Sequence, residues 1–453
     1  MRQRHAALLV LGTLAVAFPA QAGWQRARFL DAPAGNEVLP PQQGLKAVGA
    51  ARPAAGQPAM VWAVGGSQTL NTSLIVHSTD DFHSLWQSTQ CSSIAHPLNA
   101  LWVAPDASFV HAFGRSFSHA AFDGTWACTP YTVSASGLFS NFAVLGVSFA
   151  DRDNGYLGGS ATQMGSTHAL VQWTSSGATK VGGYSNVAAV ARSASGSSFF
   201  STGNQLNQVG VGPVGTVVSN PINALAFHGD SGLLVTNVGN DTRFVNGGTG
   251  AVTTLGVAPS FSNAKGVALA ATGFAVVVTA ATATTGAIYE SYDGGHTWRA
   301  ADLTGIAPAV RALAAVSCWD ENTCAAVGAN DLGAGLFEPE FLFYENLAPT
   351  AVVTVNGQPL SVHPRDDAPI CLAAAVTDPE GDPDLTITWH GAGVDASPLA
   401  VPPCFSTGVS CSPQSLDYTL DLSDGRRTAV PSPTFQVVVD HAPQPPSAPT
   451  LSP

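Results

Sequence analysis

Charged side chains are scarce in this chain of 453 residues, and basic ones are the scarcest. Charged residues make up 10% of the sequence, with 17 Lys and Arg against 30 Asp and Glu. The formal net charge of −13 argues against a nucleic-acid partner, because phosphate backbones are bound by basic surfaces. The sequence also contains no H-E-x-x-H, C-x-x-C or G-x-S-x-G motif. The sequence therefore gives no support for a zincin-type metalloprotease, for a thioredoxin-like or zinc-ribbon site, or for a serine hydrolase with a nucleophile elbow.

Glycine and proline are abundant instead, with 46 and 31 copies. Together with many Ser, Thr, Ala and Val residues, they suit short strands joined by tight turns rather than long helices. We therefore predict an all-β fold class. The chain exceeds the roughly 250–300 residues at which a single core stops growing, so we expect two domains.

The N-terminus has the pattern of a secretory signal peptide over residues 1–22. Basic residues precede an apolar stretch at 6–18, and a small-residue cleavage site ends at Ala22. We expect a mature chain that begins at Gly23 and is secreted, periplasmic or displayed on the surface of a bacterial cell. The uncharged stretch 266–289 is rich in threonine and falls in step with the strand repeat below, so we predict no membrane span after the signal peptide.

Seven cysteines in an exported chain point to disulfides, with one cysteine left unpaired or intermolecular. Cys318 and Cys324 flank a polar turn between two apolar runs, which predicts a disulfide across one hairpin. Cys91 with Cys128 is a weaker prediction. The sequence leaves open which two of the remaining three pair: Cys371, Cys404 and Cys411.

An internal repeat organises the first three quarters of the chain. Apolar runs recur at separations of 35–53 residues, and each leads through a polar turn to a second apolar run that often ends in glycine. A four-stranded propeller blade needs roughly 40–50 residues, so the period predicts a β-propeller of about seven blades, with six or eight as alternatives. The runs begin near Leu45, Leu98, Val144, Val187, Ile222, Lys265 and Val310.

The most specific motif is an Asp box, S-x-D-x-G-x-T-W, formed by Ser291, Asp293, Gly295, Thr297 and Trp298. Its residues suit a self-contained hairpin turn. The Asp293 carboxylate can accept backbone hydrogen bonds, Gly295 can adopt a positive φ, and Trp298 can pack between strands.

A degenerate copy of the motif contains Ser78, Asp80 and Trp86, and a further remnant lies at 122–126. With these motifs, residues 23–346 resemble the BNR or Asp-box β-propeller superfamily, which includes sialidase-like propellers and propellers like the photosystem II assembly factors. The resemblance implies that the Asp box is a peripheral turn. It therefore indicates a fold rather than an activity.

Residues 347–441 have a different pattern, with a D-P-x-G-D-P stretch, a strand-like L-T-I-T-W run and a later S-D-G element. This part resembles the PKD, cadherin-like and related immunoglobulin-like domains, which implies a β-sandwich. The Pro-rich tail, 442–453, reads as a linker or stalk, and the sequence leaves open whether it is anchored or truncated.

One loop of this second domain carries alternating carboxylates at Asp378, Glu380, Asp382 and Asp384. Oxygen-rich loops bind calcium, and similar loops in cadherin-like domains do so. A solvated acidic turn shaped by the intervening Pro and Gly residues is the alternative, and it is the one we favour. Calcium is the only cofactor that the sequence suggests.

An Asp-box propeller raises the possibility of a sialidase. The resemblance to those enzymes lacks their R-I-P segment, and the adjacent Tyr289 and Glu290 are expected to be peripheral beside the Asp box. An aspartate-dependent glycosidase stays open, because no spacing identifies its carboxylate pair. The aspartates in apparent turns are expected to stabilise those turns instead; they are Asp151, Asp153, Asp320 and Asp331.

No catalytic residue can be assigned, so the sequence favours a non-catalytic secreted or envelope-associated propeller that binds a protein or a glycan. A carbohydrate-active glycoside hydrolase is the first alternative. An envelope complex assembly factor is the second. The sequence does not identify the ligand.

Overall fold

The computed structural model consists of strands: every regular element among the described residues is a β-strand. This confirms the predicted all-β class. The predicted signal peptide and the Pro-rich tail lie outside the described residues, as do Asp80 and Cys411. The structure describes residues 23–30, 42–129, 142–378 and 385–439, except for the gaps 55–56, 79–83, 89–90, 92, 116–117, 162–168, 240, 256–258, 283, 335, 361–363, 365–368, 392–393, 397–403, 406–413 and 424–433.

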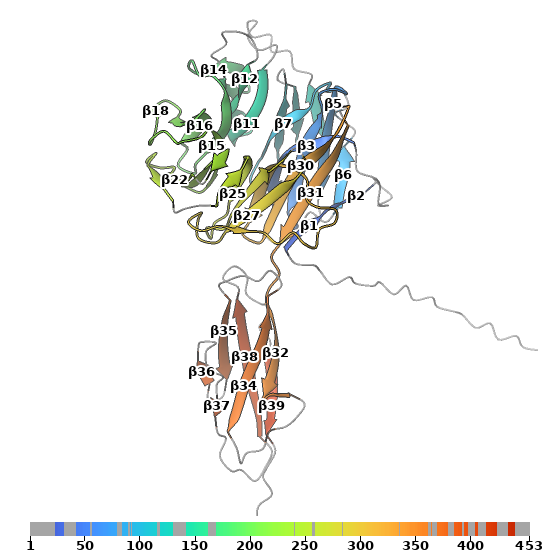
Figure 1. The fold of residues 1–453 in the computed structure, drawn as a ribbon, viewed down its shortest axis with the longest axis vertical. Helices are drawn as coiled ribbons and strands as arrows, with labels where there is room; N and C mark the ends of the chain where they lie inside the picture. The colour runs from blue at the N-terminus through green and yellow to red at the C-terminus, as the bar shows by residue number, and fades with distance from the viewer. Residues whose placement is uncertain are drawn as a thin grey trace, which may run out of the picture.

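The first body, within residues 23–346, contains seven sheets of four or five strands, arranged around a common centre (Figure 1). In four of them the strands follow chain order from the inside out. These sheets comprise β7 (Leu98–Val103), β8 (Val110–Gly114), β9 (His119–Phe122) and β10 (Trp126–Thr129); β11 (Phe142–Asp151), β12 (Asn154–Ala161), β13 (Leu170–Thr174) and β14 (Gly177–Lys180); β15 (Val187–Arg192), β16 (Ser198–Thr202), β17 (Gln205–Gln208) and β18 (Gly212–Pro213); and β25 (Ala264–Leu269), β26 (Ala275–Ala280), β27 (Gly286–Ser291) and β28 (Arg299–Ala300).

In two of the other three sheets an N-terminal strand is added at the outer edge, and in the third one strand of the chain order is left out of the sheet. A short ribbon of β21 (Val238–Gly239) and β24 (Phe261–Ser262) lies beside one of them. The three comprise β3 (Gly44–Ala51), β4 (Met60–Ser67), β5 (Thr72–Ser78) and β6 (Ser84–Ser88) with β2 (Arg28–Leu30); β19 (Ile222–His228), β20 (Ser231–Thr236), β22 (Thr242–Asn246) and β23 (Val252–Thr254); and β29 (Leu313–Asp320), β30 (Thr323–Gly333) and β31 (Leu336–Glu345) with β1 (Gly23–Arg26).

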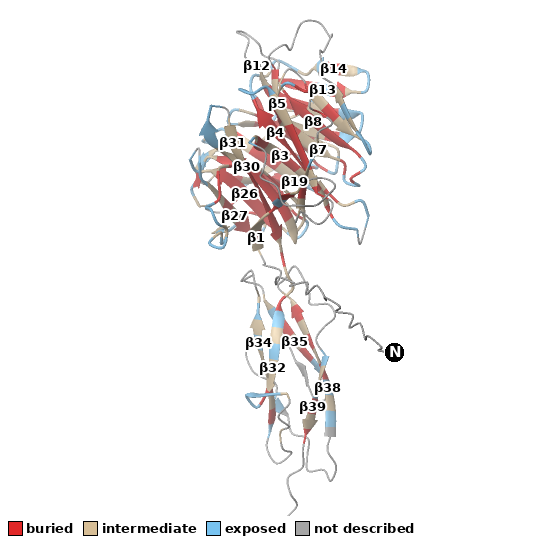
Figure 2. Ribbon diagram, turned by 90° about the vertical axis from the view of Figure 1, so that its right-hand side faces the viewer, coloured by how far each residue is buried: buried red, intermediate tan, exposed pale blue. Residues whose placement is uncertain are grey.

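The sheets form a closed ring. The innermost strands contact one another in the cyclic order β3, β7, β11, β15, β19, β25, β29 and back to β3. Each pair of neighbouring sheets encloses its own apolar core, such as the one that joins Leu45 and Val61 to Val327 and Phe341 across the ring closure. Figure 2 shows these buried layers running through the body. A ring of sheets packed face to face in this way is a β-propeller.

A steric constraint explains the glycines near the end of the second strand of a sheet. A Cβ at Gly65 would lie 1.9 Å from the carbonyl oxygen of Gly44, and one at Gly159 would lie 2.2 Å from that of Ala143. Both glycines sit where the second strand passes the start of the innermost strand. Only glycine allows the two backbones to approach so closely.

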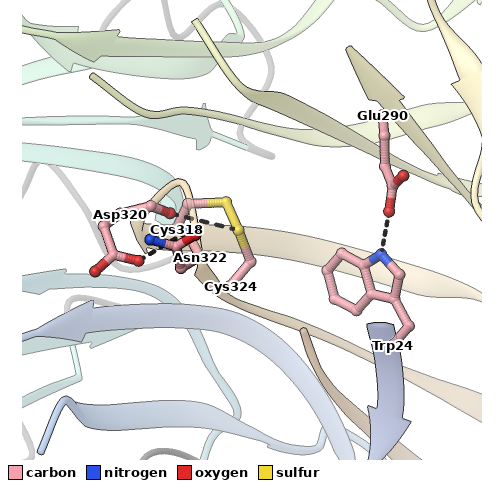
Figure 3. Close-up of a disulfide and its surroundings, with 6 residues drawn as sticks. All are labelled: Trp24, Glu290, Cys318, Asp320, Asn322 and Cys324. Carbon is pink, nitrogen blue, oxygen red and sulfur yellow. Dashed lines mark hydrogen bonds between the residues drawn. A yellow bond between two sulfur atoms is a disulfide. The ribbon is translucent and has the colours of Figure 1, made fainter. Parts of the chain in front are cut away.

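The N-terminal strands close the ring. β1 pairs antiparallel with β31, and β2 pairs parallel with β6 of the neighbouring sheet. The Arg26 guanidinium donates to both carboxylate oxygens of buried Glu340, at 2.6 and 2.8 Å. Figure 3 shows the Trp24 indole donating to Glu290 Oε1, at 2.8 Å. Strand β1 is thus held by two buried carboxylates.

Three disulfides are formed among the described residues. Cys318–Cys324 crosses one hairpin, as predicted (Figure 3), and the weaker prediction, Cys91–Cys128, is also confirmed. The third, which the sequence left open, is Cys371–Cys404.

The second body is built from two four-stranded sheets that share one core. Buried residues from both sheets meet there, including Leu372 from one and Trp389 and Leu420 from the other. The sheets comprise β33 (Gln358–Pro359), β32 (Thr350–Val355), β34 (Ile370–Thr377) and β37 (Cys404–Phe405), and β36 (Val394–Ala396), β35 (Thr386–Gly391), β38 (Gln414–Ser423) and β39 (Thr434–Val439).

Candidate binding site

Every innermost strand of the propeller contains a β-bulge just after its start. In β3, for example, Leu45 pairs with Gly65 and Ala47 pairs with Val64, so Lys46 has no partner of its own. A bulge re-aims the side chain of its extra residue away from the regular alternation of the strand. The extra residues in the seven strands are Lys46, Asn99, Leu145, Ala188 with Ala189, Asn223, Lys265 and Ala314.

These bulges line the central channel. A cavity of about 490 Å³ collects four of the extra residues, from the adjacent strands β29, β3, β7 and β11. We call the end of the propeller where the innermost strands begin the top face, and this cavity the channel-mouth pocket. The pocket is lined by Lys46, Gln68, Pro97, Asn99, Arg115, Ala143, Leu145 and Ala314.

The lining of the channel-mouth pocket contains two cations and no carboxylate among the residues described. The Lys46 ammonium donates a hydrogen bond to Asn99 Oδ1 at 3.0 Å, and burial lowers the pKa of Lys46 below its ordinary value. The Arg115 backbone carbonyl accepts bonds from the Ser118 amide and hydroxyl, which fix the turn after β8. In the described part of the chain, neither cation forms an ion pair. The pocket can therefore attract an anionic group.

Exposed aliphatic side chains lie on the top face at the first, fifth and seventh sheets, and we call them the aliphatic rim. Leu70 lies in the turn between β4 and β5, and Leu332 lies at the end of β30 in the neighbouring sheet, with exposures of 46% and 53%. Val217 precedes β19 and Val238 follows β20, so both are exposed at the same end of the fifth sheet, across the ring from the pocket. No Phe, Tyr or Trp side chain is exposed among the residues that the structure describes. Aliphatic contacts beside a cationic pocket are typical of a protein-binding surface.

A second hollow lies on the second body. It has a volume of about 550 Å³ and lies along strands β35, β38 and β39. Its polar groups bond to one another or to their neighbours: His390 Nε2 contacts Asp421 Oδ2 at 2.9 Å, and the Gln436 amide donates to Asp417 Oδ1 at 2.9 Å. Burial raises the pKa of Tyr418, which also lines this hollow, to about 12. These groups have partners already, which makes the hollow the weaker candidate.

The Asp box lies at the opposite end of the sixth sheet, in the turn between β27 and β28. The Thr297 amide and hydroxyl donate to the two oxygens of Asp293 at 2.8 and 2.7 Å, and the Gly295 amide donates to Ser291 Oγ at 2.8 Å. Gly295 has a φ of +92°, and the Trp298 indole donates to its carbonyl while packing against the core between two sheets. The motif is saturated by its own hydrogen bonds and leaves no group for a ligand.

The degenerate copy is spread over two strands. Ser78 ends β5 and Trp86 lies in β6, where it pairs with His77. Because Asp80 lies outside the described residues, nothing is assigned to the turn itself.

Three of the four aspartates expected in turns accept turn hydrogen bonds, and the fourth, Asp153, contributes its backbone amide. Asp151 accepts from the Asp153 amide at 2.8 Å, Asp320 from the Asn322 amide at 2.9 Å, and Asp331 from the Gly333 amide at 2.8 Å. Glu290, expected to be peripheral, is 4% exposed and accepts bonds from Trp24, Tyr292 and Arg299. It therefore connects the N-terminal strand to the sixth sheet.

The predicted calcium ligands cannot be placed. Asp378 follows β34, whereas Glu380 and Asp382 lie outside the described residues, so calcium binding stays a prediction. Among the described residues, no three His, Cys, Asp or Glu side chains are grouped to hold a metal ion. No helix in the described part of the chain is long and apolar enough to cross a membrane.

The residues of the channel mouth are not evident from the sequence patterns above. A signal for them was present, because Lys46, Asn99 and Asn223 each directly follow the apolar residue that opens a repeat. The sequence shows a polar residue inside an apolar run, but the direction in which its side chain points depends on a bulge. The bulge becomes visible only in the pairing of the strands.

No protein-family model matches this chain, and no curated protein matches it. Solved structures do. "YCF48 bound to D1 peptide" is 12% identical, with a TM-score of 0.50, covering 72% of this chain and 97% of that one. "YCF48 from Cyanidioschyzon merolae" is 13% identical (TM-score 0.49, 72% and 99% covered), and the "WD40 beta propeller domain of Doa1" is 14% identical (0.49, 71% and 97%). At 12% identity, the first of these matches supports the β-propeller fold and nothing beyond it.

Proposed function

We propose that this chain is a non-catalytic binding protein: an exported, seven-bladed propeller of the Asp-box type that binds a partner protein on its top face, followed by an immunoglobulin-like domain. The observation that carries the proposal is the channel-mouth pocket. It offers Lys46 and Arg115 without a carboxylate partner in the described lining, on the same face as the exposed aliphatic side chains.

Several further observations support individual parts of this proposal. Seven inter-sheet cores and seven inner-strand bulges support the blade number. The hydrogen bonds within the Asp box support the assignment of the propeller to the Asp-box type. Three disulfides are compatible with export to an oxidising compartment. Two sheets around one core support an immunoglobulin-like sandwich.

A protein partner is favoured over a glycan by the chemistry of the rim. Sugar-binding surfaces commonly stack a sugar ring on an exposed aromatic side chain, and none is exposed in the described residues. Leucine and valine side chains instead suit apolar side chains of a protein. YCF48 has been solved with a bound D1 peptide, and a peptide segment as the ligand of the present propeller is a proposal of the same kind.

Photocrosslinking tests the proposed face. A photoreactive phenylalanine analogue replaces Leu70 or Leu332 on the top face, or Val211 at the opposite end as the matched control, which is 68% exposed. In the native cell envelope, we expect the two top-face positions to yield the same defined protein adduct and Val211 to yield none. Equal crosslinking at all three positions, or none at the top face, would contradict the proposal.

The glycoside hydrolase alternative has a separate test. We expect the purified mature chain to leave a panel of fluorogenic glycosides intact. Turnover that is abolished by a single Asp→Asn change would overturn the non-catalytic function, whatever the crosslinking shows.

A further inference from the structure

Lysine is the rarest cation of this chain, and its distribution is uneven. The sequence contains three lysines: Lys46, Lys180 and Lys265. Two of them, Lys46 and Lys265, are the extra residues of inner-strand bulges. The third ends β14, the outermost strand of its sheet. The lysines are therefore concentrated at the one position per blade that a bulge directs out of the regular strand pattern.

The cyclic order of the strands places the two bulge lysines on either side of one small residue. β29 contacts β3 on one side and β25 on the other, so Ala314 lies between Lys46 and Lys265. Beyond each lysine, the next bulge residue around the ring is an asparagine: Asn99 follows Lys46, and Asn223 follows Lys265. Small and apolar residues occupy the rest of the ring, at Leu145 and at Ala188 with Ala189.

The two asparagines hold the lysine-bearing part of the ring in place. Asn99 Oδ1 accepts from the Lys46 ammonium at 3.0 Å, and the Asn223 amide donates to the carbonyl of Ala264 at 2.9 Å, directly before Lys265. Neither lysine forms an ion pair within the described residues. Their positive charges are therefore available to a ligand, in a chain whose net charge is −13.

We propose that Lys46 and Lys265 form a two-lysine clamp, seated over Ala314, that binds a carboxylate of an acidic segment of the partner protein. The clamp is a refinement that rests on the proposed top-face function. Charge complementarity selects the acidic side chain, and Leu145 with the aliphatic rim takes the apolar side chains beside it. Alanine at position 314 leaves space for the carboxylate between the lysines.

Binding of a defined peptide tests the clamp in the intact mature protein. The probe is a fluorescent, end-blocked peptide of alternating leucine and glutamate, and its control has glutamine in place of glutamate. We expect the glutamate peptide to bind and each of Lys46→Met and Lys265→Met to weaken it about tenfold, because each removes one charge-assisted bond. Lys180→Met should leave binding unchanged. Filling the gap with Ala314→Leu should weaken binding while both charges remain.

Amine acylation followed by mass spectrometry measures the accessibility of the same lysines in the unsubstituted protein. We expect the glutamate peptide to protect Lys46 and Lys265 from an amine-reactive ester and to leave Lys180 reactive. Equal protection of all three lysines, or protection by the glutamine peptide, would overturn the clamp. Protection by inorganic phosphate or by anionic lipid vesicles but not by the glutamate peptide would overturn the acidic protein segment as its ligand.

The two proposals fail in different ways. If the top-face crosslinks of Leu70 and Leu332 persist in the Lys46→Met/Lys265→Met variant with unchanged yield, the clamp is wrong and the top-face function stands. If no top-face position crosslinks a protein, the function itself is wrong. Matching thermal unfolding midpoints of the variants and the wild type exclude misfolding as the cause.

Discussion

At the scale of single residues, the least expected feature is a pair of hydrogen-bonded histidines, one buried and one half-buried, between the second and third blades. The His111 Nε2–H group donates to the Arg152 carbonyl at 2.7 Å, so His111 Nδ1 accepts from His119 Nε2–H at 2.8 Å. Burial lowers the pKa of His111 to about 4, and burial together with the neighbouring His111 lowers that of His119 to about 3. Both rings are neutral at physiological pH.

This pair predicts a loss of stability on acidification. A histidine whose native pKa is depressed stabilises the fold above its unfolded pKa of about 6.5, and this contribution is lost as the pH falls toward the native pKa. We expect the free energy of unfolding to fall by about 2–2.5 kcal/mol per pH unit between pH 6 and pH 4, because both histidines contribute. Urea unfolding as a function of pH measures it.

The His111→Gln/His119→Gln variant separates the pair from other acid-sensitive groups. It should lose most of this pH dependence, whereas His228→Gln, at an exposed position ending β19, should keep it. An unchanged slope in the double variant would assign the acid sensitivity to other groups.

At the scale of elements, the N-terminal strand depends on a buried ion network. Glu340 is fully buried and accepts from Arg26, from the Arg311 amide at 3.0 Å and from the Arg311 guanidinium at 3.4 Å. Arg311 also contacts Glu338. The single carboxylate of Glu340 therefore joins β1 to the last blade and to the loop before β29.

Glu340→Gln tests this closure. The change keeps the shape of the side chain but removes a buried charge shared by two arginines, so we expect it to cost about 3–5 kcal/mol of unfolding free energy. Glu338→Gln, on the same strand but with a 40% exposed side chain, should cost about 1 kcal/mol or less. Denaturant unfolding compares the two variants. Equal costs would show that the burial of Glu340 is not what closes the ring.

The elements also show what the sequence could predict. Apolar runs, polar turns and terminal glycines recur with the blade, so the all-β class, the propeller and the Cys318–Cys324 hairpin disulfide were readable. The channel mouth was not, because Lys46 and Lys265 are separated by 219 positions in sequence and become neighbours of Ala314 only when the ring closes. Glu290 does lie in an outer strand of its sheet, but its contact with Trp24 could not be read from the sequence, because the two residues are 266 positions apart.

At the scale of the whole molecule, the chain divides into two bodies with separate cores. Every residue of the second core lies between Ala348 and Val439, and none of the propeller cores includes a residue of this region. The propeller ends at Asn346, which is buried and bonds to Asn322 through both its amide and its side chain at 2.9 Å. The second core therefore begins only two positions after this residue, at Ala348.

Separate cores predict separate unfolding. Each body buries its own apolar residues, and the second also contains the Cys371–Cys404 disulfide, so neither needs the other to stay folded. We expect calorimetry of the mature chain to show two transitions and the excised fragment 348–441 to reproduce one of them at the same temperature. A fragment that unfolds at a much lower temperature, or a single transition in the full chain, would mean that the two bodies stabilise each other and that the second is more than an appended module.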